Sequence, residues 1–177
     1  MTSELVQRKI AHMFHALDMD DNGFLEQADF DRLVEGYARI AGWDPDSEAR
    51  ERFRHFMMTW WEMFLAGADA DHSGSVDLAE FSALLAQLES SPDAIAEAAR
   101  TVFDAMDADG DGTISVDEYR GFLRAYAVDD ASAPVHFARF DTDGDGSISG
   151  AEFEVLVVDF FQSDDAEAPG SWLWGAF

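Results

Sequence analysis

The sequence predicts an all-α protein made of four helix–loop–helix units arranged in two pairs. Three observations support this prediction. An acidic twelve-residue pattern occurs four times, apolar residues flank each copy at helical spacing, and the chain of 177 residues is long enough to bury a core. Its 47% hydrophobic residues make a core possible despite a net charge of −26. We therefore expect the two pairs to pack into one compact globular domain.

The acidic pattern occupies residues 18–29, 69–80, 107–118 and 141–152, called loops one to four below. Each copy has aspartate at positions 1 and 3, an oxygen-bearing side chain at position 5 and glycine at position 6. Each also has an apolar residue at position 8 and an acid at position 12. A solvated acidic turn would not need glycine and an apolar residue at fixed offsets. The repeat therefore predicts four loops of one defined geometry.

Helices are predicted on both sides of the loops. An aromatic residue follows each loop directly, with an apolar pair three and four positions after it, which marks one face of a helix. Asp44 before Pro45, and Ser91 before Pro92, are typical of an N-cap followed by proline at the first helical position. Aromatic residues then recur at helical spacing as far as Phe64, which predicts one long helix before loop two.

The apolar residue at position 8 predicts how the loops pair. We expect short antiparallel β-ribbons that place Leu25 beside Val76 and Ile114 beside Ile148. A lone helix–loop–helix unit cannot bury its apolar face, so paired units must share a core. The segment SSPD at residues 90–93 is the best candidate boundary between the pairs. The expected units are an N-terminal pair at 1–89, a C-terminal pair at 90–161 and an apolar tail at 162–177 that packs on the core.

The loops have the chemistry of cation sites. Crowded carboxylates repel one another, and a hard divalent cation removes that repulsion. Ca²⁺ takes about 6–8 oxygen ligands in flexible geometry, which side chains at positions 1, 3, 5 and 12, the backbone carbonyl at position 7 and the group at position 9 can supply. The expected metal ligands are Asp18, Asp20, Asn22, Phe24, Glu26 and Asp29; Asp69, Asp71, Ser73, Ser75, Asp77 and Glu80; Asp107, Asp109, Asp111, Thr113, Ser115 and Glu118; and Asp141, Asp143, Asp145, Ser147, Ser149 and Glu152.

These units resemble EF-hands, and loops three and four match the full pattern D-x-[DN]-x-[DN]-G-x₅-E. The long segment between loops one and two, the aspartate that ends loop one and the tail SWLWGAF resemble the sarcoplasmic calcium-binding proteins, especially their bacterial calerythrin-like members. The resemblance implies two EF-hand pairs in a compact arrangement and a role in calcium buffering or transport. It leaves loop two open, because that hand is often non-binding in calerythrin-like relatives.

The four sites are expected to differ. Loops three and four each offer four carboxylates, so we expect the strongest Ca²⁺ binding there. Loop one ends in Asp29, whose short side chain predicts a contracted, roughly six-coordinate site that also accepts Mg²⁺. Ser73 at position 5 makes loop two either a working site or a degraded one. The expected number of bound Ca²⁺ ions is therefore three to four.

Composition excludes several functions. A net charge of −26 repels nucleic acid and anionic lipid. No apolar run approaches the roughly 18–20 residues that span a bilayer, and the N-terminus lacks the long apolar stretch of a signal peptide. No nucleophile motif, phosphate loop or acid–base pair stands outside the loops, and cysteine is absent. We expect a cytoplasmic, non-enzymatic monomer whose partners are calcium ions.

The apolar tail decides between two modes of action. It carries Trp172, Leu173, Trp174 and Phe177. If these residues fill the protein's own cleft, the protein is expected to be a calcium buffer. If they form a removable plug, it is a sensor whose cleft meets a protein partner when the tail is displaced. A photoprotein-like role is a further alternative, which a bound chromophore would reveal.

Overall fold

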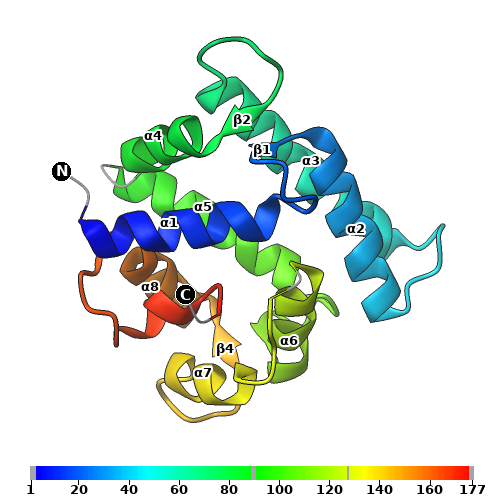
Figure 1. The fold of residues 1–177 in the computed structure, drawn as a ribbon. Helices are drawn as coiled ribbons and strands as arrows, with labels where there is room; N and C mark the ends of the chain where they lie inside the picture. The colour runs from blue at the N-terminus through cyan, green and yellow to red at the C-terminus, as the bar shows by residue number, and fades with distance from the viewer. Residues whose placement is uncertain (1–2, 89–90, 127, 176–177) are drawn as a thin grey trace.

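The computed structural model describes residues 3–88, 91–126 and 128–175. Along this part of the chain, a unit made of a helix, a loop with a short strand and a second helix occurs four times (Figure 1). This confirms the all-α fold of four helix–loop–helix units. The elements are α1 (Glu4–Leu17), β1 (Phe24–Leu25), α2 (Gln27–Ala41), α3 (Glu48–Ala68), β2 (Val76–Asp77), α4 (Leu78–Leu88), α5 (Pro92–Met106), β3 (Thr113–Ile114), α6 (Val116–Ala125), α7 (Ala133–Phe140), β4 (Ile148–Ser149), α8 (Gly150–Gln162) and the 3₁₀-helix η1 (Pro169–Trp172).

The helix starts follow local capping chemistry. The prediction for α5 is confirmed, because Pro92 is its first residue. The prediction for α3 is wrong by three residues, since the helix begins at Glu48 rather than at Pro45. The Ser47 hydroxyl accepts a hydrogen bond from the Arg50 N–H at 3.3 Å and caps the helix. Asp44 instead starts a turn, in which its carbonyl accepts from the Ser47 N–H at 3.0 Å.

Two antiparallel ribbons join the loops in pairs, as predicted. Leu25 lies opposite Val76 in the first ribbon, and Ile114 lies opposite Ile148 in the second. All four side chains are buried, so each ribbon is also the point where a loop pair enters the core. Of the expected boundary at residues 90–93, residue 90 lies outside the described residues, and Pro92 already begins α5.

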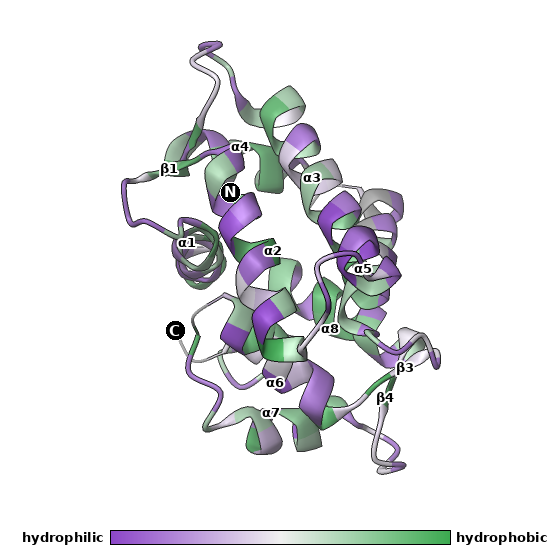
Figure 2. Cartoon of the chain, turned by 90° about the vertical axis from the view of Figure 1, so that its right-hand side faces the viewer, coloured by the Kyte–Doolittle hydropathy of each residue, from purple (hydrophilic) through white to green (hydrophobic). Residues whose placement is uncertain are grey.

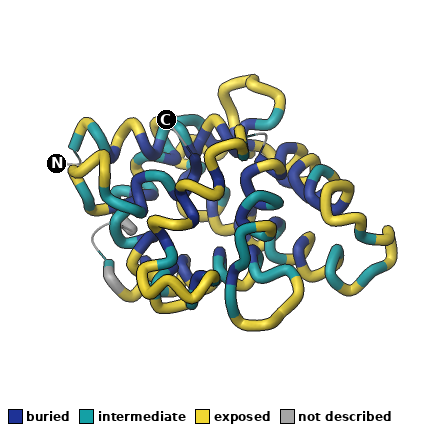
Figure 3. The backbone as a smooth tube through the Cα atoms, turned by 90° about the horizontal axis from the view of Figure 1, so that it is seen from below, coloured by how far each residue is buried: buried dark blue, intermediate teal, exposed yellow. Residues whose placement is uncertain are grey.

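The two loop pairs share one core. Buried apolar side chains from all eight helices belong to one continuous cluster. The pairs meet where α2 packs against α6 and where α1 lies between α4 and α8 (Figure 1). Hydrophobic and hydrophilic residues alternate along the helices (Figure 2), and buried positions recur along them while the loop turns are largely exposed (Figure 3). The chain is therefore one compact domain. None of its described helices has the length and apolar character needed to cross a membrane.

The C-terminal segment, residues 169–175, packs through η1 against α7 and α8, and its Trp174 reaches α1 and α6. Trp174 is only 3% exposed, with its ring centroid 5.0 Å from that of Phe122 and 4.9 Å from that of Tyr126. Its carbonyl oxygen is hydrogen-bonded to His12 Nε2 at 2.9 Å. Leu173 is equally buried. The expected packing of the tail on the core is thus present for these residues, whereas Phe177 lies outside the described residues.

Lys9, the lone lysine of the sequence, ties α1 to this C-terminal region and is fully buried. Its Nζ donates to the carbonyl oxygens of Asp159 at 3.1 Å and Ser163 at 2.9 Å. A third, longer hydrogen bond of 3.4 Å reaches the Ser171 hydroxyl. Burial lowers the pKa of Lys9, and the nearby carboxylates of Asp159 and Asp164 partly oppose that shift. Lys9 therefore caps the end of α8 and holds the C-terminal segment beside it.

Candidate metal centres

In every loop the structure brings together the acids at positions 1, 3 and 12. One carboxylate oxygen from each of the three lies within 4.8 Å of the other two. Three carboxylates this close form a donor set that suits a hard divalent cation, because such ions prefer oxygen ligands and offset the repulsion between the acids. The four groups are Asp18, Asp20 and Asp29; Asp69, Asp71 and Glu80; Asp107, Asp109 and Glu118; and Asp141, Asp143 and Glu152.

Backbone N–H groups hold the first aspartate of each loop in place. In loop four, Asp141 Oδ1 accepts from the N–H groups of Gly144 at 2.8 Å and Asp145 at 3.1 Å. Its Oδ2 accepts from the N–H of Gly146 at 2.9 Å. The corresponding bonds to residues at positions 5 and 6 also occur in the other three loops. Each loop is therefore wrapped around its own first carboxylate.

The acid at position 12 ties the two ends of its loop together. In loop four, Glu152 Oε1 accepts from the Thr142 N–H at 2.8 Å, and Oε2 accepts from the Ser149 N–H at 2.9 Å and hydroxyl at 2.8 Å. These hydrogen bonds, led by the Ser149 N–H, lower the pKa of Glu152 to about 2. The carboxylate is therefore charged at neutral pH, as a metal ligand must be.

The residues at positions 5, 7 and 9 mainly support the loop backbone. Asp111 Oδ1 accepts from both the N–H and the hydroxyl of Thr113 at 2.8 Å. Asp145 makes the same two contacts with Ser147. Within the described residues, neither aspartate belongs to the three-carboxylate groups above. Their role as ligands stays a prediction.

Position 9 caps the outgoing helix in loops three and four. The Ser115 hydroxyl accepts from the Glu118 N–H at 3.2 Å, and the Ser149 hydroxyl does the same for Glu152 at 3.4 Å. In loop two, Asp77 Oδ1 accepts from the Glu80 N–H at 2.8 Å. In these three loops the residue at position 9 thus orients the acid at position 12. This structural role does not depend on whether position 9 also supplies a ligand to a metal ion. The other predicted ligands at positions 5, 7 and 9 lie in the same loop turns and are Asn22, Phe24, Glu26, Ser73 and Ser75.

Position 4 distinguishes the two loop pairs, a difference that the motif analysis missed. The backbone turns into the left-handed region there in every loop, with φ of 77° at Gly110 and 73° at Gly144. The equivalent residues are Asp21 at 56° and His72 at 60°. A non-glycine residue in this conformation costs on the order of 1 kcal/mol, less for aspartate than for histidine. Loops three and four therefore reach the loop conformation with less backbone strain.

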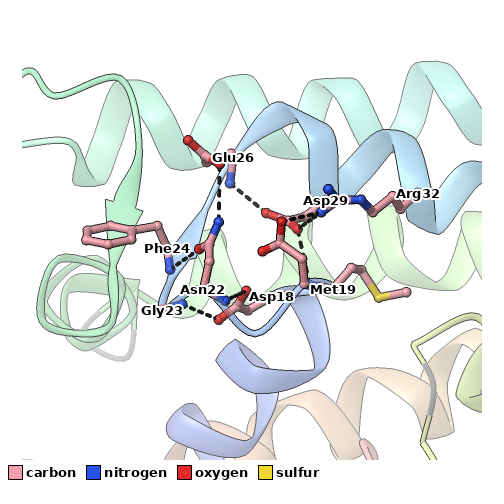
Figure 4. A network of polar contacts seen from close by, with 9 residues as sticks. Asp18, Met19, Asn22, Gly23, Phe24, Glu26, Asp29 and Arg32 are labelled. Carbon is pink, nitrogen blue, oxygen red and sulfur yellow. Dashed lines mark hydrogen bonds and ion pairs between the residues drawn. The ribbon is translucent and has the colours of Figure 1, made fainter.

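Loop one has two features of its own (Figure 4). Asp29 is 1% exposed, and this burial raises its pKa although the Glu26 N–H donates to it at 2.9 Å. Arg32 Nη1 lies 2.8 Å from Asp20 Oδ2 and 3.0 Å from Asp29 Oδ1. Arg32 lies three residues beyond the loop and therefore outside the twelve-residue motif. Aligning the four units would have revealed it, because the equivalent residues are uncharged.

Comparisons with known proteins agree with this geometry. The family model described as an EF-hand domain pair matches residues 46–124 and 96–158. A sarcoplasmic calcium-binding protein of Hediste diversicolor is 30% identical over 98% of either chain. The chain belongs to this family of EF-hand proteins. This EF-hand protein accordingly binds calcium through its loops, and its family is generally non-enzymatic.

Two solved structures are similar to this EF-hand protein over most of its length. A calcium-binding protein of Streptomyces coelicolor, associated with prokaryotic calcium-mediated regulation, is 27% identical. It has a TM-score of 0.73 and covers 88% of this chain and 97% of its own. The coelenterazine-binding protein of Renilla muelleri has a TM-score of 0.81 and covers 99% of each chain. Its identity is 21%, so it shares the fold alone.

Proposed function

We propose that this protein is a calcium buffer or transporter rather than a calcium sensor. The observation that carries the proposal is the burial of Leu173 and Trp174 among helices of both loop pairs. A sensor opens an apolar groove for a target when calcium binds. Here the chain's own C-terminal segment fills the apolar position that a target helix would take.

The apolar space beside Leu173 and Trp174 supports this proposal. A cavity of about 40 Å³ lies among Met13, Trp60, Phe160 and Trp174. Ligand pockets usually measure roughly 300–1,000 Å³, so this one is far too small for a target side-chain cluster or a chromophore. Apolar groups that are already buried provide no driving force for binding a partner. Calcium binding would then tighten the fold instead of exposing a surface.

We further propose that the ligands are the predicted residues at positions 1, 3, 5, 7, 9 and 12 of each loop, with three to four Ca²⁺ bound. Loops three and four bind most tightly, because each combines four acids with glycine at position 4. Loop two carries the strain of His72 and has Ser73 in place of an acid, so it is the weaker member of its pair. Loop one, closed by the short Asp29, accepts Mg²⁺ as well as Ca²⁺.

The two ribbons support a division into an N-terminal pair at residues 1–89 and a C-terminal pair at 90–161, and the tail at 162–177 is proposed to pack on the core. We expect the protein to act as a cytoplasmic monomer, because its strong negative charge opposes self-association. The same charge disfavours nucleic acid and anionic membranes as partners. No catalytic role is proposed.

Calorimetric titration of chelator-treated protein, combined with binding of a hydrophobic dye, tests the proposal. We expect uptake of three to four Ca²⁺ ions and a large rise in melting temperature, since each independent site at 100 times its Kd adds about 2.7 kcal/mol. Dye fluorescence should fall or stay constant when calcium is added. A strong rise in dye fluorescence on adding calcium would instead identify a sensor.

A sensor is the second candidate, and the polar anchoring of the tail favours it. His12, Lys9 and the Tyr119 hydroxyl hold the segment through exchangeable hydrogen bonds. A basic amphipathic partner could displace such a segment and enter the cleft. Deletion of residues 169–177 should then expose a surface that binds the dye. The sensor proposal replaces the buffer proposal if the truncated protein binds a basic amphipathic helix and the full-length protein binds the same helix in the presence of calcium.

A further inference from the structure

We infer that Arg32 is a built-in competitor for the cation of loop one. Its guanidinium bridges two of the carboxylates that the proposed function assigns to the ion, so a divalent cation must bind against this positive charge or displace it. The inference rests on the proposed metal site in loop one. It names the residue that sets the affinity of that site.

The contact is geometrically specific. A single nitrogen, Nη1, lies 2.8 Å from Asp20 Oδ2 and 3.0 Å from Asp29 Oδ1. These oxygens belong to positions 3 and 12, the same positions that converge with Asp18 in the three-carboxylate group. Figure 4 shows the Arg32 side chain reaching back from α2 to the closing aspartate of the loop. The guanidinium therefore neutralises two acids whose counterparts in the other loops form no ion pair within the described residues.

Arg32 and its partner Asp29 are held very differently. The Asp29 side chain is 1% exposed and is fixed by the N–H groups of Met19 at 3.2 Å and Glu26 at 2.9 Å. The Arg32 side chain is 46% exposed. Arg32 can therefore swing into solvent without opening the core, whereas Asp29 stays in place. The competitor is the mobile member of the contact.

The other three units provide an internal comparison. The residue three positions after the loop is Arg32 in the first unit, whereas the equivalent residues are Ala83, Gly121 and Val155. All four positions lie in the first turns of the helix that leaves the loop. The effect should therefore be confined to loop one.

Charge determines the size of the effect. An exposed ion pair is worth little by itself, but a positive charge beside the site repels a divalent ion with twice the energy of a monovalent one. We expect Arg32 to weaken cation binding at loop one about tenfold. Since Ca²⁺ and Mg²⁺ carry the same charge, both should be weakened alike. Loop one would then fill at a higher calcium concentration than it would without Arg32, which extends the range over which the protein buffers calcium.

The test is a calcium titration of full-length protein followed by amide NMR, comparing the parent with Arg32→Gln. The glycine at position 6 of each loop donates its N–H to the first aspartate of that loop at 2.8–3.1 Å, so its resonance reports on one site. In Arg32→Gln, the midpoint of the Gly23 resonance should move to about tenfold lower calcium. The midpoints of the other three glycines, Gly74, Gly112 and Gly146, should not change.

Three further variants separate charge from structure. Arg39→Gln removes the same charge from the far end of α2 and should leave the Gly23 midpoint unchanged. Arg32→Lys keeps the charge and should stay close to the parent. Val155→Arg places an arginine at the equivalent, 58% exposed position beside loop four and should raise the Gly146 midpoint severalfold. Circular dichroism of each variant verifies that it is folded.

The outcomes distinguish the inference from the function on which it rests. If Gly23 responds to calcium but Arg32→Gln leaves its midpoint unchanged or raises it, Arg32 supports the site and the inference is wrong, while the metal site stands. If Gly23 fails to respond in the parent and in every variant while the glycines of loops three and four do respond, loop one holds no ion. Both the inference and the loop-one part of the proposed function then fail.

Discussion

Replacing Trp174 by alanine should loosen the C-terminal segment and expose the cleft that it fills. A buried tryptophan removes up to about 250 Å² from water, which corresponds to roughly 6 kcal/mol as an upper bound. Measured tryptophan-to-alanine substitutions in cores cost about 3–5 kcal/mol. The loss cannot exceed the free energy that holds the segment in place, because the segment can detach before the domain unfolds. We therefore expect the free energy of unfolding to fall by about 3 kcal/mol.

The assay combines urea unfolding in saturating calcium with binding of a hydrophobic dye. Trp174→Ala should lower the unfolding midpoint and increase dye fluorescence, because the cavity beside Met13 and Trp60 opens to solvent. Trp172→Ala is the matched control within the same segment. Trp172 as a whole is only partly buried, and its ring contacts the Arg139 guanidinium and the His136 ring. This control should lose less stability and bind little dye.

A loss below 1 kcal/mol together with unchanged dye fluorescence in Trp174→Ala would refute the reasoning. It would mean that the segment contributes little to stability and that the cleft is closed by other residues. The buffer proposal would then lose its main support.

Three other predictions follow from packing, ligand length and ionisation. Gly170→Ala should destabilise the protein by about 1–3 kcal/mol in urea unfolding, because the added methyl group would overlap the carbonyl oxygen of Leu156. Gly150→Ala is the matched control. Its methyl group would meet nothing within 4 Å, so this variant should be neutral or slightly stabilising. Asp29→Glu should raise the preference of loop one for Ca²⁺ over Mg²⁺ in competitive calorimetry, and an unchanged ratio would contradict the contracted site. All three tyrosines are buried, and burial raises their pKa values. The pKa of Tyr37 rises from 10.0 to about 12. The folded state therefore favours the neutral form of each tyrosine. The contribution of the tyrosines to stability is complete below pH 10 and is lost as the pH rises toward 12. Melting temperatures and tyrosinate absorbance, both measured against pH, should record this loss. Ionisation near pH 10 in the folded protein would argue against the burial of the tyrosines.

Much of the candidate site was predictable because the EF-hand loop is a local structure. The twelve residues that enclose a cation are contiguous, and alternating acids with glycine at position 6 encode the turn directly. The ribbon partners could also be predicted, since position 8 is the one loop position that is apolar in all four copies. Position 4 was missed because its requirement is a backbone angle, which Asp21 and His72 adopt without a distinctive sequence signal.

Contacts between distant segments could not be derived from the pattern. The sequence gives Lys9 the pattern of an ordinary helical lysine. Its three acceptors, Asp159, Ser163 and Ser171, lie 150 to 162 residues further along the chain. The start of α3 depended on a competition between two candidate capping residues, Asp44 and Ser47, which the Ser47 hydroxyl wins.

By itself, the sequence determined that this chain forms four helix–loop–helix units with cation-binding loops, because each loop's chemistry is complete within twelve consecutive residues. Only the tertiary structure decided that Trp174 fills the cleft between the pairs and that Arg32 turns back onto loop one. Those outcomes depend on which surfaces remain unburied once the helices have packed, and on where a long flexible side chain finds its best partners.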